Sequence, residues 1–180
     1  MKLRLLPAVL TLSGASLVGI AVHEAYREHA YDDGVGVQTI GFGTTRHADG
    51  RPVRPGDRMS VERALIRLNA DAQQMQQAMR QCIGPVPLYQ HEWDAYVSLT
   101  YNIGSSAFCR STLVRRLRET PPNYRAACNE ILRWNQGGGQ VMRGLVKRRQ
   151  AEHAQCLGPA AAAAPTPAPA AAPAAPGARP

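Results

Sequence analysis

An uncharged segment near the start of the sequence sets the first constraint on how this chain folds. It runs from Leu5 to Val22 and follows two cations, Lys2 and Arg4. A helix needs roughly 17–25 apolar residues to cross a bilayer, and this segment is about the minimum. Thr, Ser and Gly dilute its Leu and Val, so we expect a helix that inserts but is weakly held. Because the positive charge precedes the segment, its amino end should be cytoplasmic and the body should lie across the membrane.

A cleaved signal peptide is the competing interpretation, since small residues near the end of the segment offer a cut site. Cleavage after Ala21 would, however, leave Glu24, which begins the motif described below, at a ragged terminus. We therefore favour an uncleaved anchor in residues 1–22, followed by one folded domain in residues 23–157. Residues 158–180 contain only Gly, Ala, Pro, Thr and Arg. They predict an extended tail with no core and no catalytic role.

Charge and cysteine content exclude several classes of function. The chain has 21 Lys and Arg against 13 Asp and Glu, a net charge of +8, which favours polyanionic partners. No Arg-rich arm or zinc-ligand spacing indicates a nucleic-acid module, so we expect no nucleic-acid partner, no metal and no cofactor. The four cysteines, which lack any CxxC pair, are compatible with two disulfides or with four reduced thiols, and the three possible pairings stay open. They are Cys82, Cys109, Cys128 and Cys156.

The hydrophobic pattern predicts an α+β domain with a short β region followed by helices. The Gly-rich stretch 34–43 alternates small and β-favouring residues, which indicates a hairpin with Thr39 on its first strand. A long helix starts at Ser60, its N-cap, and ends at Gly84-Pro85. Further helices are expected over residues 88–103, 111–118, 123–134 and 145–156, with a flexible triple-glycine loop before the last. The long helix would join a small β lobe to a helical lobe.

Three residues near the amino end have the side chains that glycoside hydrolysis needs. Glu24 ends a helical stretch, Asp33 lies in the loop before the glycines, and Thr39 lies on a strand. An acid, a carboxylate and a hydroxyl would thus converge across a helix–sheet cleft, where one carboxyl protonates the leaving oxygen and the other serves water or attacks the sugar. Taken alone the pattern is weak, because most acidic residues are simply solvated at the surface.

The stretch resembles the phage-type lysozymes of glycoside hydrolase family 24. Glu24, Asp33 and Thr39 have the family's spacing of Glu, eight residues, Asp or Cys, five residues, and Thr. The residues that match the motif Y-x-D-x-x-G-x-x-T-I-G-x-G are Tyr31, Asp33, Gly36, Thr39, Ile40, Gly41 and Gly43. Later segments resemble the family's N-x-G, STL and W…G…GLxxRRxxE patterns. One departure is Ala25, where many members have glycine after the catalytic Glu.

The resemblance implies a mainly helical lysozyme-like fold and an inverting muramidase that cuts the β-1,4 bond between N-acetylmuramic acid and N-acetylglucosamine. Glu24 would be the general acid, and Asp33 and Thr39 would hold the attacking water. The apolar segment resembles signal-anchor-release segments of some endolysins. The expected partners are peptidoglycan glycan strands and, through residues 5–22 before release, the inner membrane. The protein would then be a monomer in the periplasm of a Gram-negative host.

Two further residues carry weaker expectations. Asn102, in the N-x-G pattern, would bind sugar or, in the interpretation we favour, cap its helix. Arg148 would line the cleft. In the interpretation we favour, Arg148 and Arg149 instead form ion pairs with acids such as Glu152 on a solvated face. Two alternatives to the muramidase remain. One is a lytic transglycosylase, which needs only the acid, and the other is a non-catalytic, membrane-tethered wall-binding protein.

The position of Glu24, just after the apolar segment, suggests how the enzyme is regulated. While residues 5–22 span the bilayer, the acid is held at the lipid surface, away from the loop that carries Asp33 and Thr39. A misplacement near one ångström can cost about a hundredfold in rate. The anchored form should therefore be inactive, and release should let the segment refold onto the domain.

Overall fold

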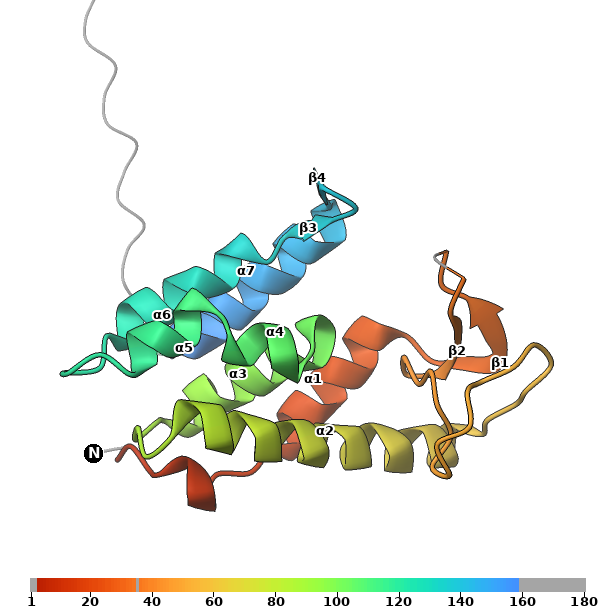
Figure 1. Ribbon diagram of the computed structural model, residues 1–180, viewed down its shortest axis with the longest axis horizontal. Helices are drawn as coiled ribbons and strands as arrows, with labels where there is room; N and C mark the ends of the chain where they lie inside the picture. The colour runs from red at the N-terminus through yellow and green to blue at the C-terminus, as the bar shows by residue number, and fades with distance from the viewer. Residues whose placement is uncertain (1–2, 35, 159–180) are drawn as a thin grey trace, which may run out of the picture.

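The computed structural model describes residues 3–34 and 36–158, and it has the expected α+β architecture (Figure 1). Two small antiparallel hairpins accompany a set of helices around the long helix α2. The elements, in chain order, are η1 (Pro7–Val9), α1 (Gly14–Glu24), β1 (Arg27–Asp32), β2 (Gln38–Gly41), α2 (Val61–Ile83), α3 (Gln90–Ile103), α4 (Ser105–Cys109), α5 (Thr112–Leu117), α6 (Tyr124–Glu130), η2 (Ile131–Arg133), β3 (Gln136–Gly137), β4 (Gln140–Val141) and α7 (Arg143–Leu157).

The first hairpin starts earlier in the chain than the sequence pattern predicts. Its first strand is β1, which pairs antiparallel with β2 and places Thr39 opposite Tyr31. Thr39 is therefore on the second strand, and the prediction that it lies on the first was wrong. Gly34 and Gly36 have φ values of 92° and 83° and form the turn between the strands, a conformation open to glycine. The strand before them was missed because it is mostly polar and almost fully exposed.

The long connecting helix agrees with the prediction at both ends. The Ser60 hydroxyl caps α2 by accepting a hydrogen bond from the Arg63 backbone N–H, and Gly84, with φ 76°, ends it. The apolar side chains recur at helical spacing and face the core. They include Ala64, Leu68, Ala72, Met79 and Ile83. In Figure 1 this helix runs from the β lobe, which we define as residues 25–60, to the far side of the helical body.

The helical body is centred on α3, whose side chains from Glu92 to Thr100 are all buried. Helix α7 packs along α3, and so does α1. The four helices expected after residue 85 are confirmed, with α6 ending at Glu130 before a 3₁₀ turn. In this part of the chain, a short helix and a hairpin were not predicted. The short helix α4 follows Gly104, and the triple-glycine segment forms the β3–β4 hairpin where we expected a flexible loop.

The apolar N-terminal segment does not form one long helix here. It divides into η1 and α1, and Leu10 and Ile20, 1% and 0% exposed, belong to the same core as the rest of the domain. Among residues 3–34 and 36–158, no helix has both the length and the apolar character needed to span a bilayer. The observed form is thus a docked segment rather than the bilayer-crossing helix that the sequence predicts.

Disulfides connect helices that are distant in the sequence. Cys82, at the end of α2, is bonded to Cys109 in α4, and Cys128 in α6 is bonded to Cys156 in α7. The structure therefore selects one of the three pairings and disagrees with the alternative of four reduced thiols. Most of the predicted Ala/Pro-rich tail, residues 159–180, lies outside the described residues.

Candidate active site

Glu24 lies at the junction between the docked N-terminal segment and the β lobe. It is the last residue of α1, and Ala25 then adopts φ 51°, which turns the chain toward β1. This is the left-handed region that favours glycine, and it falls where the sequence departs from the family's glycine. The Glu24 side chain is 18% exposed, and its Oε1 atom accepts a hydrogen bond of 2.7 Å from Nη1 of Arg148.

Arg148 belongs to a buried cluster of charges and not to a solvated face, so that part of the prediction was wrong. The pairing with Glu152 is confirmed, since Arg148 Nε and Arg149 Nε lie 3.1 and 2.9 Å from its two carboxylate oxygens. The three side chains are 7%, 1% and 3% exposed. The hydroxyl of Ser98 on α3 also donates to Glu152 at 2.7 Å. Charges of a polar helix are buried here because they neutralise one another.

Burial around this cluster acts on the ionisation of its neighbours. Loss of water lowers the pKa of Arg149, while the Glu152 carboxylate opposes that shift. An arginine remains charged in such a setting. Loss of water and the Arg148 guanidinium also lower the pKa of His23, which precedes Glu24. The cluster therefore gives the inner side of Glu24 a fixed positive partner.

Thr39 and Asp33 both come from the β1–β2 hairpin. Thr39 is 5% exposed on β2, and its hydroxyl donates to the Val37 carbonyl at 3.4 Å. Asp33 is exposed in the loop after β1, where its carboxylate accepts a hydrogen bond of 3.1 Å from the Val37 backbone N–H. The hairpin thus holds the carboxylate in a wetter place than Thr39 or Glu24.

The turn after Thr39 brings the hairpin next to Glu24. Gly41 and Gly43 have φ values of 66° and 90°. A Cβ atom at Gly43 would lie 3.7 Å from Oε2 of Glu24, and one at Gly41 would lie 3.0 Å from Sδ of Met59. Gly41 therefore lets the backbone approach the start of α2, and Gly43 lets it approach Glu24. Oε1 of Glu24 faces Arg148, whereas Oε2 faces this turn.

Known protein families, sequences and structures contain clear matches to this chain. The family model for phage lysozyme matches residues 21–152. The chain belongs to the phage lysozyme family. It is 35% identical over 149 residues to the endolysin of Salmonella phage P22, covering 83% of this chain and 99% of that one. It is 31% identical over 134 residues to the SAR-endolysin of Bacteriophage PS119, covering 74% and 76%.

The endolysin from Escherichia coli O157:H7 phage FAHEc1 is a similar solved structure, with a TM-score of 0.74 and 35% identity over 83% of this chain and 95% of that one. As a phage lysozyme, the chain is a glycoside hydrolase with an α+β lysozyme-like fold. Its function is the muramidase-type lysis of the bacterial cell wall, and its substrate is peptidoglycan.

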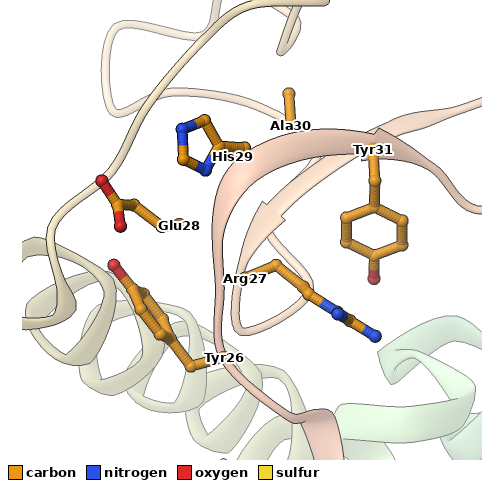
Figure 2. A pocket seen from close by; sticks show the side chains of 6 residues that line it. All are labelled: Tyr26, Arg27, Glu28, His29, Ala30 and Tyr31. Atoms are coloured by element: carbon orange, nitrogen blue, oxygen red, sulfur yellow. The ribbon is translucent and has the colours of Figure 1, made fainter.

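The strand that follows Glu24 lines a hollow that sequence reasoning missed. Residues 26–31 line an open hollow of about 610 Å³. Figure 2 shows Arg27 and Tyr31 on one side of the β1 ribbon and Tyr26 and Glu28 on the other. The Arg27 guanidinium carbon lies 5.9 Å from the centre of the Tyr31 ring. Tyr31 was already part of the lysozyme motif, and that was the signal available in the sequence.

Asn102 is the remaining predicted residue. It is exposed near the end of α3, and Gly104 closes that helix through its backbone N–H, 2.8 Å from the Thr100 carbonyl. Within the described residues, the Asn102 side chain makes no hydrogen bond of a cap, so the capping role that we favoured is not seen. The structure thus brings Glu24, Arg148 and the turn after Thr39 together and leaves Asn102 at the surface.

Proposed function

We propose that this lysozyme inverts configuration as it cuts the β-1,4 bond between N-acetylmuramic acid and N-acetylglucosamine. Glu24 is the general acid, Asp33 positions the attacking water and the Thr39 hydroxyl completes the site of that water. One observation carries the proposal. Glu24 is held through Oε1 by a buried arginine, which leaves Oε2 toward the glycine turn that continues from Thr39. A proton donor with one fixed and one presented oxygen suits protonation of a leaving oxygen.

Arg148 would act through Glu24 rather than by direct contact with the sugar. Its Nε atom faces Glu152, its Nη2 atom donates to the Ser98 carbonyl at 3.3 Å, and its Nη1 atom holds Glu24. The guanidinium is thus engaged on each side by the protein. We propose for it the role of orienting the acid. Asn102 is proposed to contact the glycan, since its amide is exposed and not committed to a cap.

The role of Glu24 as the acid is tested by the substitution Glu24→Gln, which keeps the shape of the side chain and removes the proton donor. We expect turbidity loss of outer-membrane-permeabilised cells to fall by at least about a hundredfold, in line with the loss of a general acid. Glu119→Gln, which changes an exposed acid on the helical body, is the matched control and should keep wild-type activity. Retention of more than a tenth of the activity by Glu24→Gln would contradict the proposal.

The products distinguish hydrolysis from the transglycosylase alternative. A hydrolase yields a reducing sugar that has gained water, whereas a lytic transglycosylase yields an anhydro sugar. We expect mass analysis to find the reducing product, and Asp33→Asn to reduce its rate at least about a hundredfold because the water loses its base. Anhydro products, or full activity of Asp33→Asn, would favour the transglycosylase. Binding of peptidoglycan without any product would favour the non-catalytic wall-binding protein.

We propose, in addition, that residues 5–22 span the inner membrane before they dock as described. Support comes from apolar side chains that this fold leaves in water, since Val9, Val18 and Val22 are 67%, 64% and 74% exposed. The SAR-endolysin name of several relatives points the same way. The anchored protein would have its amino end in the cytoplasm and its body in the periplasm, and it would be released there as a monomer.

The docked form contains polar contacts that a membrane-spanning segment could not make. The Leu12 backbone N–H donates to Gln76 at 2.7 Å, and that of Ser13 donates to Asp94 at 2.9 Å. Because Glu24 ends the helix that starts here, undocking would displace the acid from Arg148. The anchored form is therefore inactive in this proposal.

Fractionation of a Gram-negative host that expresses the full chain tests this proposal. Before the membrane potential is collapsed, we expect the protein in the membrane fraction without wall-degrading activity. After collapse it should be soluble, active and monomeric by sedimentation. Equal activity in the two fractions would refute inhibition by the membrane, and a protein that is soluble from the start would refute the anchor.

A further inference from the structure

A tyrosine of the helical body is bonded to the backbone of the β lobe. Tyr101 lies in the last turn of α3, and its Oη atom donates a hydrogen bond of 3.0 Å to the carbonyl oxygen of Phe42. Phe42 is at the tip of the glycine turn that follows Thr39. The hydrogen bond therefore joins the central helix of one lobe to the catalytic motif of the other.

The turn that receives this hydrogen bond is closed by its own hydrogen bonds and packed against Tyr26. Ile40 and Thr44 exchange two backbone hydrogen bonds of 2.9 Å, which close the turn at its base. The Phe42 side chain is 6% exposed and packs on Tyr26, with ring centres 5.6 Å apart. A shift of the Phe42 carbonyl would thus carry the whole turn with it.

Glu24 and Thr39, which take part in the proposed chemistry, both lie next to this turn. Gly43, the next residue, is where an added Cβ would lie 3.7 Å from Oε2 of Glu24. Thr39 directly precedes Ile40, which opens the turn. The turn is therefore the structural link between the acid on α1 and the hydroxyl on β2.

We propose that Tyr101 is a positioning residue that sets the gap between Glu24 and Thr39 by holding the Phe42 carbonyl. This inference rests on the proposed function, because it assigns Tyr101 to the geometry of that reaction. The hydroxyl donates to a backbone carbonyl and not to Glu24 or Thr39. The hydroxyl acts by holding the turn in place. It thereby controls the distance between Glu24 and Thr39, and with it the placement of the acid and the water on the sugar.

The environment of Tyr101 keeps its hydroxyl a donor. Burial raises the pKa of Tyr101 well above its usual value, and the Asp71 and Glu24 carboxylates add to the shift. The phenol therefore stays protonated at neutral pH. Removing the oxygen alone leaves the ring to fill the same space, so the loss is confined to the hydrogen bond.

The experiment compares two tyrosines of the same helix in the full-length, released protein. Tyr101→Phe removes the hydroxyl that holds the turn. Tyr96→Phe is the matched control, since Tyr96 is fully buried on α3 and its Oη atom lies 3.8 Å from Sγ of Cys128, within the helical body. Both variants are measured for kcat and KM on a soluble, peptide-free glycan oligomer. Hydrogen exchange of the Ile40 and Thr44 amides is measured alongside.

For Tyr101→Phe we expect kcat to fall about tenfold with KM within about twofold, as a small misplacement of reacting groups would cause. The Ile40 and Thr44 amides should exchange about tenfold faster, and Tyr96→Phe should change neither readout. Unchanged kcat and exchange in Tyr101→Phe would overturn the inference, and so would an equal loss in Tyr96→Phe. If Glu24→Gln stays active, the proposed function fails, whereas the exchange result still decides whether Tyr101 holds the turn.

Discussion

The helices α1 and α7 pack on the same partner, α3, yet their sequences and their burial are opposite. Helix α1 is mostly apolar, but Ile20 is its one buried residue and Val18 and Val22 face water. Helix α7 is strongly basic, but it buries Arg148, Arg149 and Glu152. The two meet where Arg148 holds Glu24. In Figure 1, α1 lies in orange between the β lobe and the body, and α7 lies in blue.

The difference shows that the character of a helix does not by itself indicate which side chains are buried. The charges of α7 are buried because they are paired, with Arg148 and Arg149 on the two oxygens of Glu152. On α1, Val18 and Val22 are mostly in water, which agrees with the proposal that this segment also lies in lipid.

The largest expected effect on stability comes from the buried charges of α7. Glu152→Gln leaves the buried Arg149 without its counter-charge and Arg148 with Glu24 alone, and we expect the free energy of unfolding in urea to fall by about 3–5 kcal/mol. Glu119→Gln, which removes an exposed pair with Arg116, should change it by less than about 1 kcal/mol. Similar losses in both variants would mean that burial of the α7 charges contributes nothing special.

The second-largest effect is expected at Arg4, whose polar contacts hold the docked segment on the helical body. Arg4 lies 2.8 Å from the buried Glu92, and its guanidinium carbon lies 4.2 and 3.6 Å from the ring centres of Tyr89 and Tyr124. We expect Arg4→Gln to lower the free energy of unfolding of the released form by about 1–3 kcal/mol. The control is Arg51→Gln, which removes an exposed pair with Asp49 and should cost less than about 1 kcal/mol. If Arg4→Gln lowers the free energy of unfolding no more than Arg51→Gln does, the contacts of Arg4 do not hold the segment in place.

A smaller effect concerns pH, at the place where the two helices meet. Loss of water and the nearby Arg148 lower the pKa of His23 in the folded state. The unfolded chain therefore takes up the proton first as pH falls through the usual histidine range near about 6.5, so stability is present above that range and declines below it. His23→Gln should flatten the melting temperature between about pH 7.5 and 5.5. An unchanged slope would assign the dependence to another group, such as His153, whose pKa is also lowered.

The smallest effect on stability is expected on the outer face of α1. The double variant Val18→Thr, Val22→Thr keeps the side-chain shape, and we expect the free energy of unfolding to stay within about 0.5 kcal/mol of the wild type. Membrane retention before release should nevertheless decrease, because the segment becomes less apolar. Ile20→Thr, on the buried face of the same helix, should cost about 2–4 kcal/mol. Equal costs for the two faces would remove the contrast between α1 and α7.

Much of the fold was accessible from the sequence because local signals agree there with tertiary structure. The Ser60 cap, the helical spacing and Gly84 together defined α2. Strand β1 was not predicted, since a mostly polar strand exposed on nearly every residue lacks the alternation by which strands are recognised. The contact between Arg148 and Glu24 joins residues 124 positions apart, and no local pattern reports on such a distance.

The sequence by itself determined the spacing of Glu24, Asp33 and Thr39 and the glycines that turn the chain beside them, because spacing and backbone freedom are properties of neighbouring residues. The tertiary structure decided that the apolar segment docks in two pieces, that the α7 charges are buried, and that Tyr101 reaches Phe42. Burial and pairing depend on which distant segments pack against a side chain. A polarity pattern records what a residue prefers, and only the packed chain supplies the partner that overrides it.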